Sequence, residues 1–201
     1  MNKMNIAFIG AGNVASGLGN LLSKSGHLVK YGTQNPSETQ ISMADAIDFG
    51  DIICFAIPYS AMNGVLQAYK DQLKGKIVVD ITNPINSSDW SPIFLGEDSG
   101  GEQTARILSE SRVVKAFNTI FADVMKEDGK KFNGQKLTAF IATNDNQAGE
   151  TIKEIAQDIG FNAVVIHDIK NARYLEAMAH LNIAIALEKS NTDAGFTYLE
   201  R

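Results

Sequence analysis

The chain has 201 residues, of which 44% are hydrophobic and 20% charged, and its formal net charge is -5. This balance is typical of a globular protein with a real core, and the acidic charge argues against nucleic acid and anionic membranes as partners, because both attract basic surfaces. No apolar run approaches the roughly 18 residues of a membrane helix, and we expect no signal peptide before the first strand-like segment. The single cysteine, Cys54, excludes an internal disulfide framework, so we expect a cytoplasmic protein.

Short apolar runs alternate with helical patterns along the chain. Strands are expected at residues 4–9, 28–31, 51–57, 76–81, 112–117, 137–142 and 162–166, and helices at 13–25, 37–47, 59–73, 101–110, 119–126, 146–159 and 170–189. This alternation predicts an α/β protein with a doubly wound, mostly parallel sheet, which is a Rossmann-like fold. Residues 85–101 are rich in Ser, Gly and Asp and are expected to form a long surface loop. Because nothing marks a linker, residues 1–201 are expected to form one domain.

The stretch IGAGNVASGLG precedes and begins the first of these helices, with the spacing Gly10-x-Gly12-x-x-Ala15. Gly10 would permit a tight turn, Gly12 would let the backbone approach a pyrophosphate, and Ala15 is small enough for close packing of the helix on the strand. The backbone N–H groups around Asn13 and Val14 would then meet the phosphates. A plain glycine turn is the alternative, but the strand before it and the helix after it favour a dinucleotide site.

The end of the second expected strand bears on which dinucleotide binds. An acid there would bind the ribose 2′-hydroxyl of NAD, but the segment VKYGTQNPSE has none at the strand end. It offers Thr33, Gln34, Asn35 and Ser37, neutral groups that can donate hydrogen bonds to a 2′-phosphate, which favours NADP. NAD stays open, because the arginine that would be a stronger sign of NADP is absent and Lys30 lies inside the strand.

Three further segments follow expected strands, at the edge where open α/β sheets bind ligands: AIPYSAM, DITNPIN and KAFNTIF. Each places polar or aromatic residues directly after an apolar run, namely Pro58, Tyr59, Asn83, Pro84, Asn118 and Thr119. Asn and Pro are ordinary turn formers, which explains any one of these sites but explains three aligned edges less well. We therefore expect ligand contacts here, with Tyr59, Pro84 and Asn118 as the candidate substrate-binding residues.

With these segments in view, the chain resembles the family of NADP oxidoreductases that depend on coenzyme F420, a deazaflavin. It also resembles the related reductase domain of the six-transmembrane metalloreductases. The resemblance is carried by IGAGNVASGLGNLLSKSGHLVKYGTQNP, FAIPYSAM, KIVVDITNP, VVKAFNTI and ARYLEAMAHLNIAIAL, which span nearly the whole chain. The glycine turn is generic, whereas the TNP and KAFNT segments are considerably more specific.

The resemblance implies a single domain that transfers hydride between NADPH and a flavin or deazaflavin acceptor stacked over the nicotinamide. By position, the family's phosphate turn corresponds to Gly10, Gly12, Asn13 and Val14. Its 2′-phosphate loop corresponds to Thr33 and Gln34, and its nicotinamide cleft to Ile57, Pro58, Asn83 and Ala116. The chain departs from the family at Gln34, where many members carry an arginine, and nothing specifically matches the acceptor pockets of the deazaflavin-using members. No catalytic residue is expected, because the cofactors carry the reaction while the protein supplies orientation and stacking.

Other reactive side chains are weaker candidates. Tyr59 and Lys115 are the only proton donors near the proposed edge, and Lys115, inside a strand, is expected to point away from it. His167 follows the last strand and could approach a ligand, whereas His27 is expected in a turn and His180 in helix packing. No spacing of His, Cys and Asp suggests a metal.

Two aromatic residues and the last helix leave alternatives open. Trp90 and Phe94, in the long loop, either cover an aromatic acceptor or anchor the loop by being buried. The last helix, which contains AMAHLNIAIAL, is apolar enough to pack on its own sheet or on the partner chain of a homodimer. Two other functions also stay open: a non-catalytic dinucleotide-binding redox sensor, and a small dehydrogenase of a hydroxy or imino acid completed by dimerisation.

Overall fold

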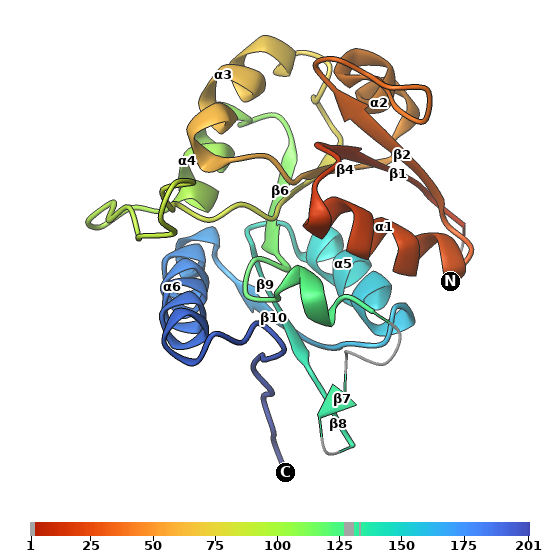
Figure 1. Ribbon diagram of the computed structural model, residues 1–201. Coiled ribbons are helices and arrows are strands. Elements are labelled where there is room, and N and C mark those ends of the chain that lie inside the picture. The colour runs from red at the N-terminus through yellow and green to blue at the C-terminus, as the bar shows by residue number, and fades with distance from the viewer. Residues whose placement is uncertain (1–2, 127–130, 133) are drawn as a thin grey trace.

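The computed structural model describes residues 3–126, 131–132 and 134–201 (Figure 1). An eight-stranded sheet has the order β10-β9-β6-β5-β4-β1-β2-β3. Its strands are β1 (Asn5–Ile9), β2 (Leu28–Thr33), β3 (Ile41–Ser42), β4 (Ile52–Phe55), β5 (Ile77–Asp80), β6 (Arg112–Ala116), β9 (Thr138–Thr143) and β10 (Asn162–His167). The short strands β7 (Lys131–Phe132) and β8 (Gln135–Lys136) pair separately with each other.

Strand direction divides the sheet into two parts. The strands from β1 to β6 are parallel, whereas β9 is antiparallel to β6 and β10 is parallel to β9. The sheet is therefore mostly parallel and Rossmann-like, as expected. Because β10 runs the opposite way, its last residue, His167, lies at the sheet edge opposite the glycine turn. His167 therefore lies away from the proposed cofactor edge, and its approach to any ligand stays a prediction.

Helices cover both faces of the sheet, which explains why its strands are almost continuously apolar. On one face, α1 (Asn13–Lys24) and α5 (Asn146–Asp158) pack over a core that includes Phe8, Leu18 and Ile152. On the other face, α2 (Met43–Phe49), α3 (Tyr59–Tyr69) and α4 (Gly100–Ile107) pack over a second core. The last helix, α6 (Ala172–Lys189), follows β10 and the 3-10 turn η2 (Ile169–Asn171). No helix within the described ranges is both long and apolar enough to cross a bilayer.

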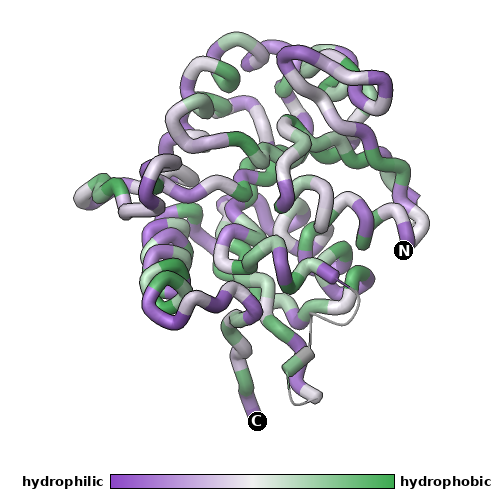
Figure 2. Tube along the Cα trace, viewed as in Figure 1, coloured by the Kyte–Doolittle hydropathy of each residue, from purple (hydrophilic) through white to green (hydrophobic). Residues whose placement is uncertain are grey.

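Hydrophobic and hydrophilic residues alternate along the Cα trace, and hydrophobic residues gather in the central strands (Figure 2). Successive residues of a strand point to opposite faces, so β1 contributes Phe8 to the core beneath α1 and Ile9 to the core beneath α2 and α3. The sheet thus has a hydrophobic core on each of its faces.

Two expected helices differ from the structure. The helix expected at 119–126 is only the 3-10 turn η1 (Ala122–Val124), because the carbonyls of Asn118 and Thr119 accept hydrogen bonds from Asn83 and Asn182 and not from a following helix. The helix expected at 37–47 begins at Met43, where the Ser42 side chain accepts a hydrogen bond from the Asp45 N–H at 3.1 Å.

Candidate active site

The glycine turn lies where the strand order reverses, since β1 has β2 on one side and β4 on the other. Gly10 has a φ of 105°, and its N–H donates to the Gly32 carbonyl at 2.9 Å. A Cβ at Gly10 would overlap the carbonyl oxygen of Ala56, so the position requires glycine. Open α/β sheets bind their ligands at such a switch point.

The N-terminus of α1, which follows this turn, is open. Gly12 is its N-cap, no side chain caps it, and its first turn holds no acid. A Cβ at Gly12 would meet nothing within 4 Å. The N-termini of α3 and α6 also lack a side-chain cap, whereas those of α2, α4 and α5 are capped by the side chains of Ser42, Ser99 and Asp145. The end of α1 therefore presents its N–H groups and its positive dipole to open space, which fits a pyrophosphate.

The loop after β2 holds the residues expected at the 2′-phosphate. Thr33 Oγ1 donates to Gln40 Oε1 at 3.0 Å, so this hydroxyl must change its partner before it can donate to a phosphate. Gln34 is exposed. Lys30 points to another part of the protein, with its ammonium 4.5 Å from the centre of the Phe49 ring.

The four residues expected along the nicotinamide cleft come from the carboxyl ends of three neighbouring strands. Ile57 and Pro58 follow β4; Ile57 is half-buried and Pro58 is exposed. Asn83 follows β5 and is half-buried. Ala116 ends β6 and is fully buried. Because β1, β4, β5 and β6 are parallel, these residues share the sheet edge of the glycine turn.

Asn83 and Asn118 tie the ends of β5 and β6 together. Asn83 Nδ2 donates to the Asn118 carbonyl at 2.8 Å, and Asn118 Nδ2 donates to Asn83 Oδ1 at 2.9 Å and to the Leu175 carbonyl at 3.0 Å. Phe117, directly before Asn118, has a φ of 61°, which is rare for a bulky residue. Asn118 is buried, and its Oδ1 has no partner within the described residues. The amide pair therefore links the two strand ends by hydrogen bonds at this edge.

The structure separates the three candidate substrate-binding residues. Pro84 is buried and its carbonyl oxygen lies 3.0 Å from His180 Nε2, while Asn118 is buried in the amide pair. Tyr59 is half-buried, and burial is the main cause that raises its pKa. Tyr59 is therefore the one of the three whose side chain lines an open pocket.

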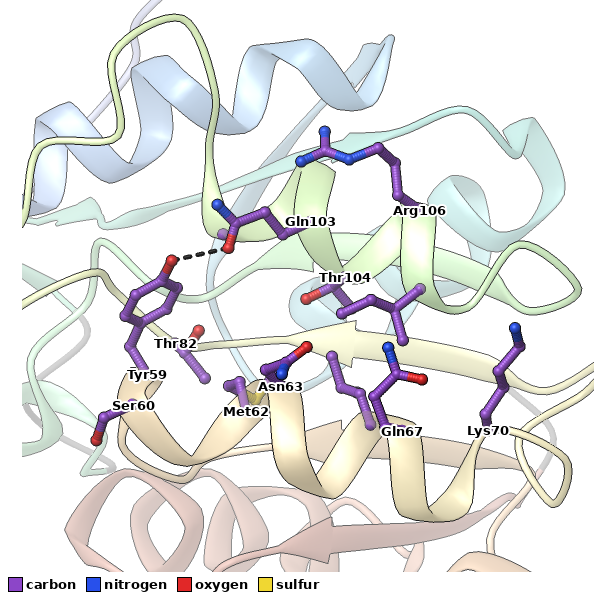
Figure 3. Close-up of a pocket in the computed structure, with 13 residues that line it drawn as sticks. Tyr59, Ser60, Met62, Asn63, Gln67, Lys70, Thr82, Gln103, Thr104 and Arg106 are labelled. Carbon is purple, nitrogen blue, oxygen red and sulfur yellow. Dashed lines mark hydrogen bonds between the residues drawn. The ribbon is translucent and has the colours of Figure 1, made fainter.

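This pocket, of about 550 Å³, lies between α3 and α4 (Figure 3). Tyr59, Thr82 and Gln103 line its end near the carboxyl edge of the sheet, where Tyr59 Oη donates to Gln103 Oε1 at 2.7 Å. Farther from this edge, the wall includes Asn63, Gln67 and Lys70 from α3 or its end, and Arg106 from α4. The glycine turn does not line this pocket. Two residues at the inner end of the pocket are chain neighbours of nicotinamide candidates: Tyr59 directly follows Pro58, and Thr82 directly precedes Asn83.

A buried charge cluster beside the pocket contains residues that the sequence reasoning missed. Lys115 is fully buried, with its Nζ 2.9 Å from Glu176 Oε1, 3.3 Å from Asp80 Oδ1 and 2.6 Å from the Thr82 carbonyl oxygen. Burial alone would lower the pKa of Lys115, but the charges of Asp80 and Glu176 outweigh it and raise this pKa. Lys115 thus stays charged and inaccessible, and it does not serve the cleft as a proton donor.

Glu176 also closes the N-terminus of α4. Its two carboxylate oxygens accept hydrogen bonds from the N–H groups of Gly100 and Gly101, each at 3.0 Å. One turn earlier in α6, Arg173 forms a two-pronged ion pair with Glu102, at 2.7 and 2.8 Å. An acid flanked by the apolar residues Leu175 and Ala177 was the available signal in the sequence for this role.

The loop aromatics are not buried. Trp90 is 53% exposed and Phe94 is 83% exposed, although the Phe94 ring packs edge-on against His180 with a centroid distance of 6.2 Å. The alternative in which the loop anchors itself by burying both aromatics is therefore wrong. Their role as a cover for an acceptor stays a prediction.

A Rossmann-like sheet with an open glycine turn at its switch point defines the class of dinucleotide-binding oxidoreductases. Residues 5–84 match the family model described as NADP oxidoreductase, coenzyme F420-dependent. The F420-dependent NADP reductase of Methanothermobacter thermautotrophicus is 31% identical over 158 residues, which are 75% of this chain and 67% of that protein. The chain belongs to this family and is by that membership an NADP-dependent oxidoreductase.

Two further relatives extend the comparison. The metalloreductase STEAP3 of Rattus norvegicus is 28% identical over 86% of this chain, but the match spans only 36% of that protein. A solved structure from Arthrobacter sp. FB24, provisionally described as an F420-dependent NADP reductase, has a TM-score of 0.87 and 26% identity and covers 98% of this chain and 100% of its own. The family thus supports NADP and coenzyme F420 as the expected pair of cofactor and co-substrate.

Proposed function

We propose that this protein transfers hydride between NADPH and a deazaflavin or flavin acceptor that stacks over the nicotinamide. The open N-terminus of α1 at the switch point is the observation that carries the proposal, because it offers unpaired N–H groups where a pyrophosphate would lie. Gly10 and Gly12 would shape the cradle, and Asn13 and Val14 would donate backbone N–H groups to the phosphates.

The nicotinamide would lie over the carboxyl ends of β4, β5 and β6, against Ile57, Pro58, Asn83 and Ala116. Because Ala116 is fully buried, its contribution would come through the backbone. The amide pair of Asn83 and Asn118 would fix the orientation of the ring, and the exposed loop with Trp90 and Phe94 would restrict water. This arrangement requires no acid–base residue, because the two cofactors exchange the hydride directly.

The preference for NADP over NAD would rest on the loop after β2. Gln34 is exposed and free to donate to a 2′-phosphate, whereas Thr33 would first release Gln40. Fluorescence titration with NADPH and NADH measures this preference. Tenfold tighter binding of NADH than of NADPH would contradict the proposed roles of Thr33 and Gln34.

Stopped-flow mixing tests the reaction itself. The protein is mixed with NADPH and either oxidised coenzyme F420, FMN or FAD, and the loss of NADPH absorbance is followed. We expect a loss that saturates with the acceptor. Binding of NADPH without any absorbance loss would instead favour the redox sensor, in which the same cradle reports the cofactor to a partner.

A homodimer is the second part of the proposal. The outer face of α6 is apolar and solvent-exposed along its length, through Tyr174 (69% exposed), Leu181 (55%) and Ile185 (36%). A helix that is apolar on both its inner and outer faces is normally covered on both. Light scattering would reveal a dimer, and charge introduced by Leu181→Glu is expected to give a monomer, whereas a wild-type monomer at working concentration would remove the idea.

A dimer would also supply a missing wall for the alternative function, a small dehydrogenase of a hydroxy or imino acid. Turnover of such substrates with NADP⁺, and none of any flavin, would favour this alternative. The cytoplasmic location stays a prediction as well, and its support is Cys54, which is the chain's only cysteine and is buried in β4.

A further inference from the structure

The pocket between α3 and α4 has a lining that the transfer of hydride does not use. We propose that this pocket binds an anionic side chain of the acceptor, with a phosphate or carboxylate group near Lys70, while the acceptor ring occupies the nicotinamide cleft. The inference rests on the proposed function, because it requires an acceptor whose ring lies at the carboxyl edge. It assigns the pocket a role in acceptor selection.

The charge of the lining carries the first part of the argument. The chain has a net charge of -5, yet the 13 lining residues include no acid; of their two cations, Arg106 is paired with Asp98 and Lys70 has no ion pair within the described ranges. The remaining polar groups are mostly amides and hydroxyls, which can donate hydrogen bonds to anionic oxygens. A cationic, donor-rich pocket on an acidic protein fits an anionic ligand.

The neighbouring carboxylates are neutralised within the protein. Asp98 is held by both Nη atoms of Arg106, at 3.0 and 2.6 Å, and these hydrogen bonds lower its pKa to about 2. Asp80 lies 3.3 Å from the Lys115 ammonium and accepts a hydrogen bond from Thr104, which lines the pocket. Lys70, in contrast, forms no ion pair with any residue in the described ranges, so its charge is available to a ligand.

The position of Lys70 carries the second part. In Figure 3 the side chains of Gln67 and Lys70 extend from α3 toward α4 and so line the far end of the pocket. Tyr59 begins α3 and Lys70, eleven residues later, is its C-cap, so the two are separated by about 16 Å of axial rise. That distance is about the span of four to five extended peptide units, so the pocket suits a long, flexible chain.

The inner end of the pocket is formed by residues that adjoin the candidate cleft in the sequence. Tyr59 and Thr82 line the pocket, and their chain neighbours Pro58 and Asn83 are nicotinamide candidates. A volume of about 550 Å³ lies within the range of ligand sites. One ligand could therefore place its ring in the cleft and its chain between α3 and α4.

Charge reversal at Lys70 tests the proposal. The full chain and its Lys70→Glu variant are assayed with NADPH and two matched pairs of acceptors, coenzyme F420 with its uncharged ribityl deazaflavin fragment, and FMN with riboflavin. We expect the KM for at least one charged acceptor to rise about five- to tenfold, with that of its uncharged partner and the Kd for NADPH unchanged. Lys136→Glu, an equal charge change at exposed β8, is the control and should alter neither KM.

Ionic strength gives a readout that a merely structural role would not move. In the wild type, the KM for the sensitive charged acceptor should rise with salt, and Lys70→Glu should abolish or invert this dependence. Equal effects of Lys70→Glu and Lys136→Glu, or equal effects on charged and uncharged acceptors, would overturn the assignment while leaving the proposed function intact. If no acceptor is reduced, the proposed function itself fails, and unchanged binding of oxidised FMN to the Lys70→Glu variant in fluorescence titration would then overturn the pocket assignment separately.

Discussion

The N-termini of α1 and α4 lie at the same edge of the sheet, but only that of α4 is bound by side chains of the protein. Both begin beside glycines, and both present N–H groups and a positive dipole. At α1 no side chain caps the helix and the space over Gly12 is open. At α4 the Glu176 carboxylate accepts from Gly100 and Gly101, so an internal anion occupies the place that a ligand phosphate would take.

The two helix N-termini therefore have different roles at the same sheet edge: that of α4 contributes to stability, and that of α1 is proposed to bind the cofactor. Glu176 comes from α6, so its carboxylate fastens the last helix to the parallel part of the sheet and, through Lys115, to Asp80 at the end of β5. The open end of α1 makes no such link, and under the proposed function its N–H groups receive a ligand. A change at α4 should therefore affect stability first, and a change at α1 should affect cofactor affinity first.

Removing the internal anion should give the largest effect. Glu176→Gln keeps the shape of the side chain but removes the charge that faces Lys115 and the end of α4. Loss of one partner of a buried ion pair is expected to lower the free energy of unfolding by about 3 kcal/mol. Urea unfolding measures it, and Glu188→Gln, an exposed change on the same helix, should stay within about 0.5 kcal/mol of wild type. A loss below about 1 kcal/mol for Glu176→Gln would show that this closure contributes little to stability.

A carboxylate introduced at the uncapped N-terminus of α1 should cap this helix and block its phosphate site. Gly12 has φ -74° and ψ -175°, which any residue adopts, and a Cβ there meets no atom within 4 Å. Gly12→Asp is therefore expected to cap the helix without loss of stability, while its carboxylate repels the pyrophosphate and weakens NADPH binding about a hundredfold. Gly12→Ala is the control for size and should weaken binding far less. Unaltered NADPH affinity in Gly12→Asp would remove α1 as the phosphate cradle.

The N-terminus of a third helix, α5, is capped by a partly exposed carboxylate, that of Asp145. Asp145 caps α5 and is paired with Arg112 at 2.8 Å, and these hydrogen bonds lower its pKa from the ordinary value of 3.8 to about 2. Because the folded-state pKa is depressed, its stabilisation is complete above about pH 4 and is lost as the pH falls toward 2. Allowing for solvent screening, the contribution is about 1 kcal/mol.

Acid unfolding of wild type and Asp145→Asn checks this expectation. The two stability curves should converge as the pH falls from about 4 toward 2, because protonation removes from the wild type what the variant already lacks. Arg112→Gln should show the same convergence. Parallel curves across this pH range would mean that the Asp145 carboxylate is not stabilised in the folded protein.

The open helix end could be predicted from the sequence, but the closed one could not. Gly10 and Gly12 form a local pattern, and the strand and helix that flank them fix its geometry within a dozen residues. Glu176 lies 75 residues or more from the glycines it binds, and no spacing rule connects them. The same limit explains His167, whose position depends on the direction of β10, since an apolar strand has the same pattern whether it is parallel or antiparallel. The strand ends at Asn83 and Asn118 were predicted as a group, whereas their mutual hydrogen bonds required the structure.

The smallest expected effect concerns a second phosphate position, the loop after β2. This loop holds no cation near the strand end, and the Lys30 ammonium packs over the Phe49 ring. Gln34→Arg would place a guanidinium on the exposed loop, where it can bind the 2′-phosphate of NADPH with two hydrogen bonds. At an exposed site this is worth less than about 1 kcal/mol, so the Kd for NADPH should fall about threefold, with that for NADH unchanged. Parallel fluorescence titrations measure the two constants. An equal gain for NADH would mean that the new charge attracts the pyrophosphate at α1 and that the loop after β2 does not contact the 2′-phosphate.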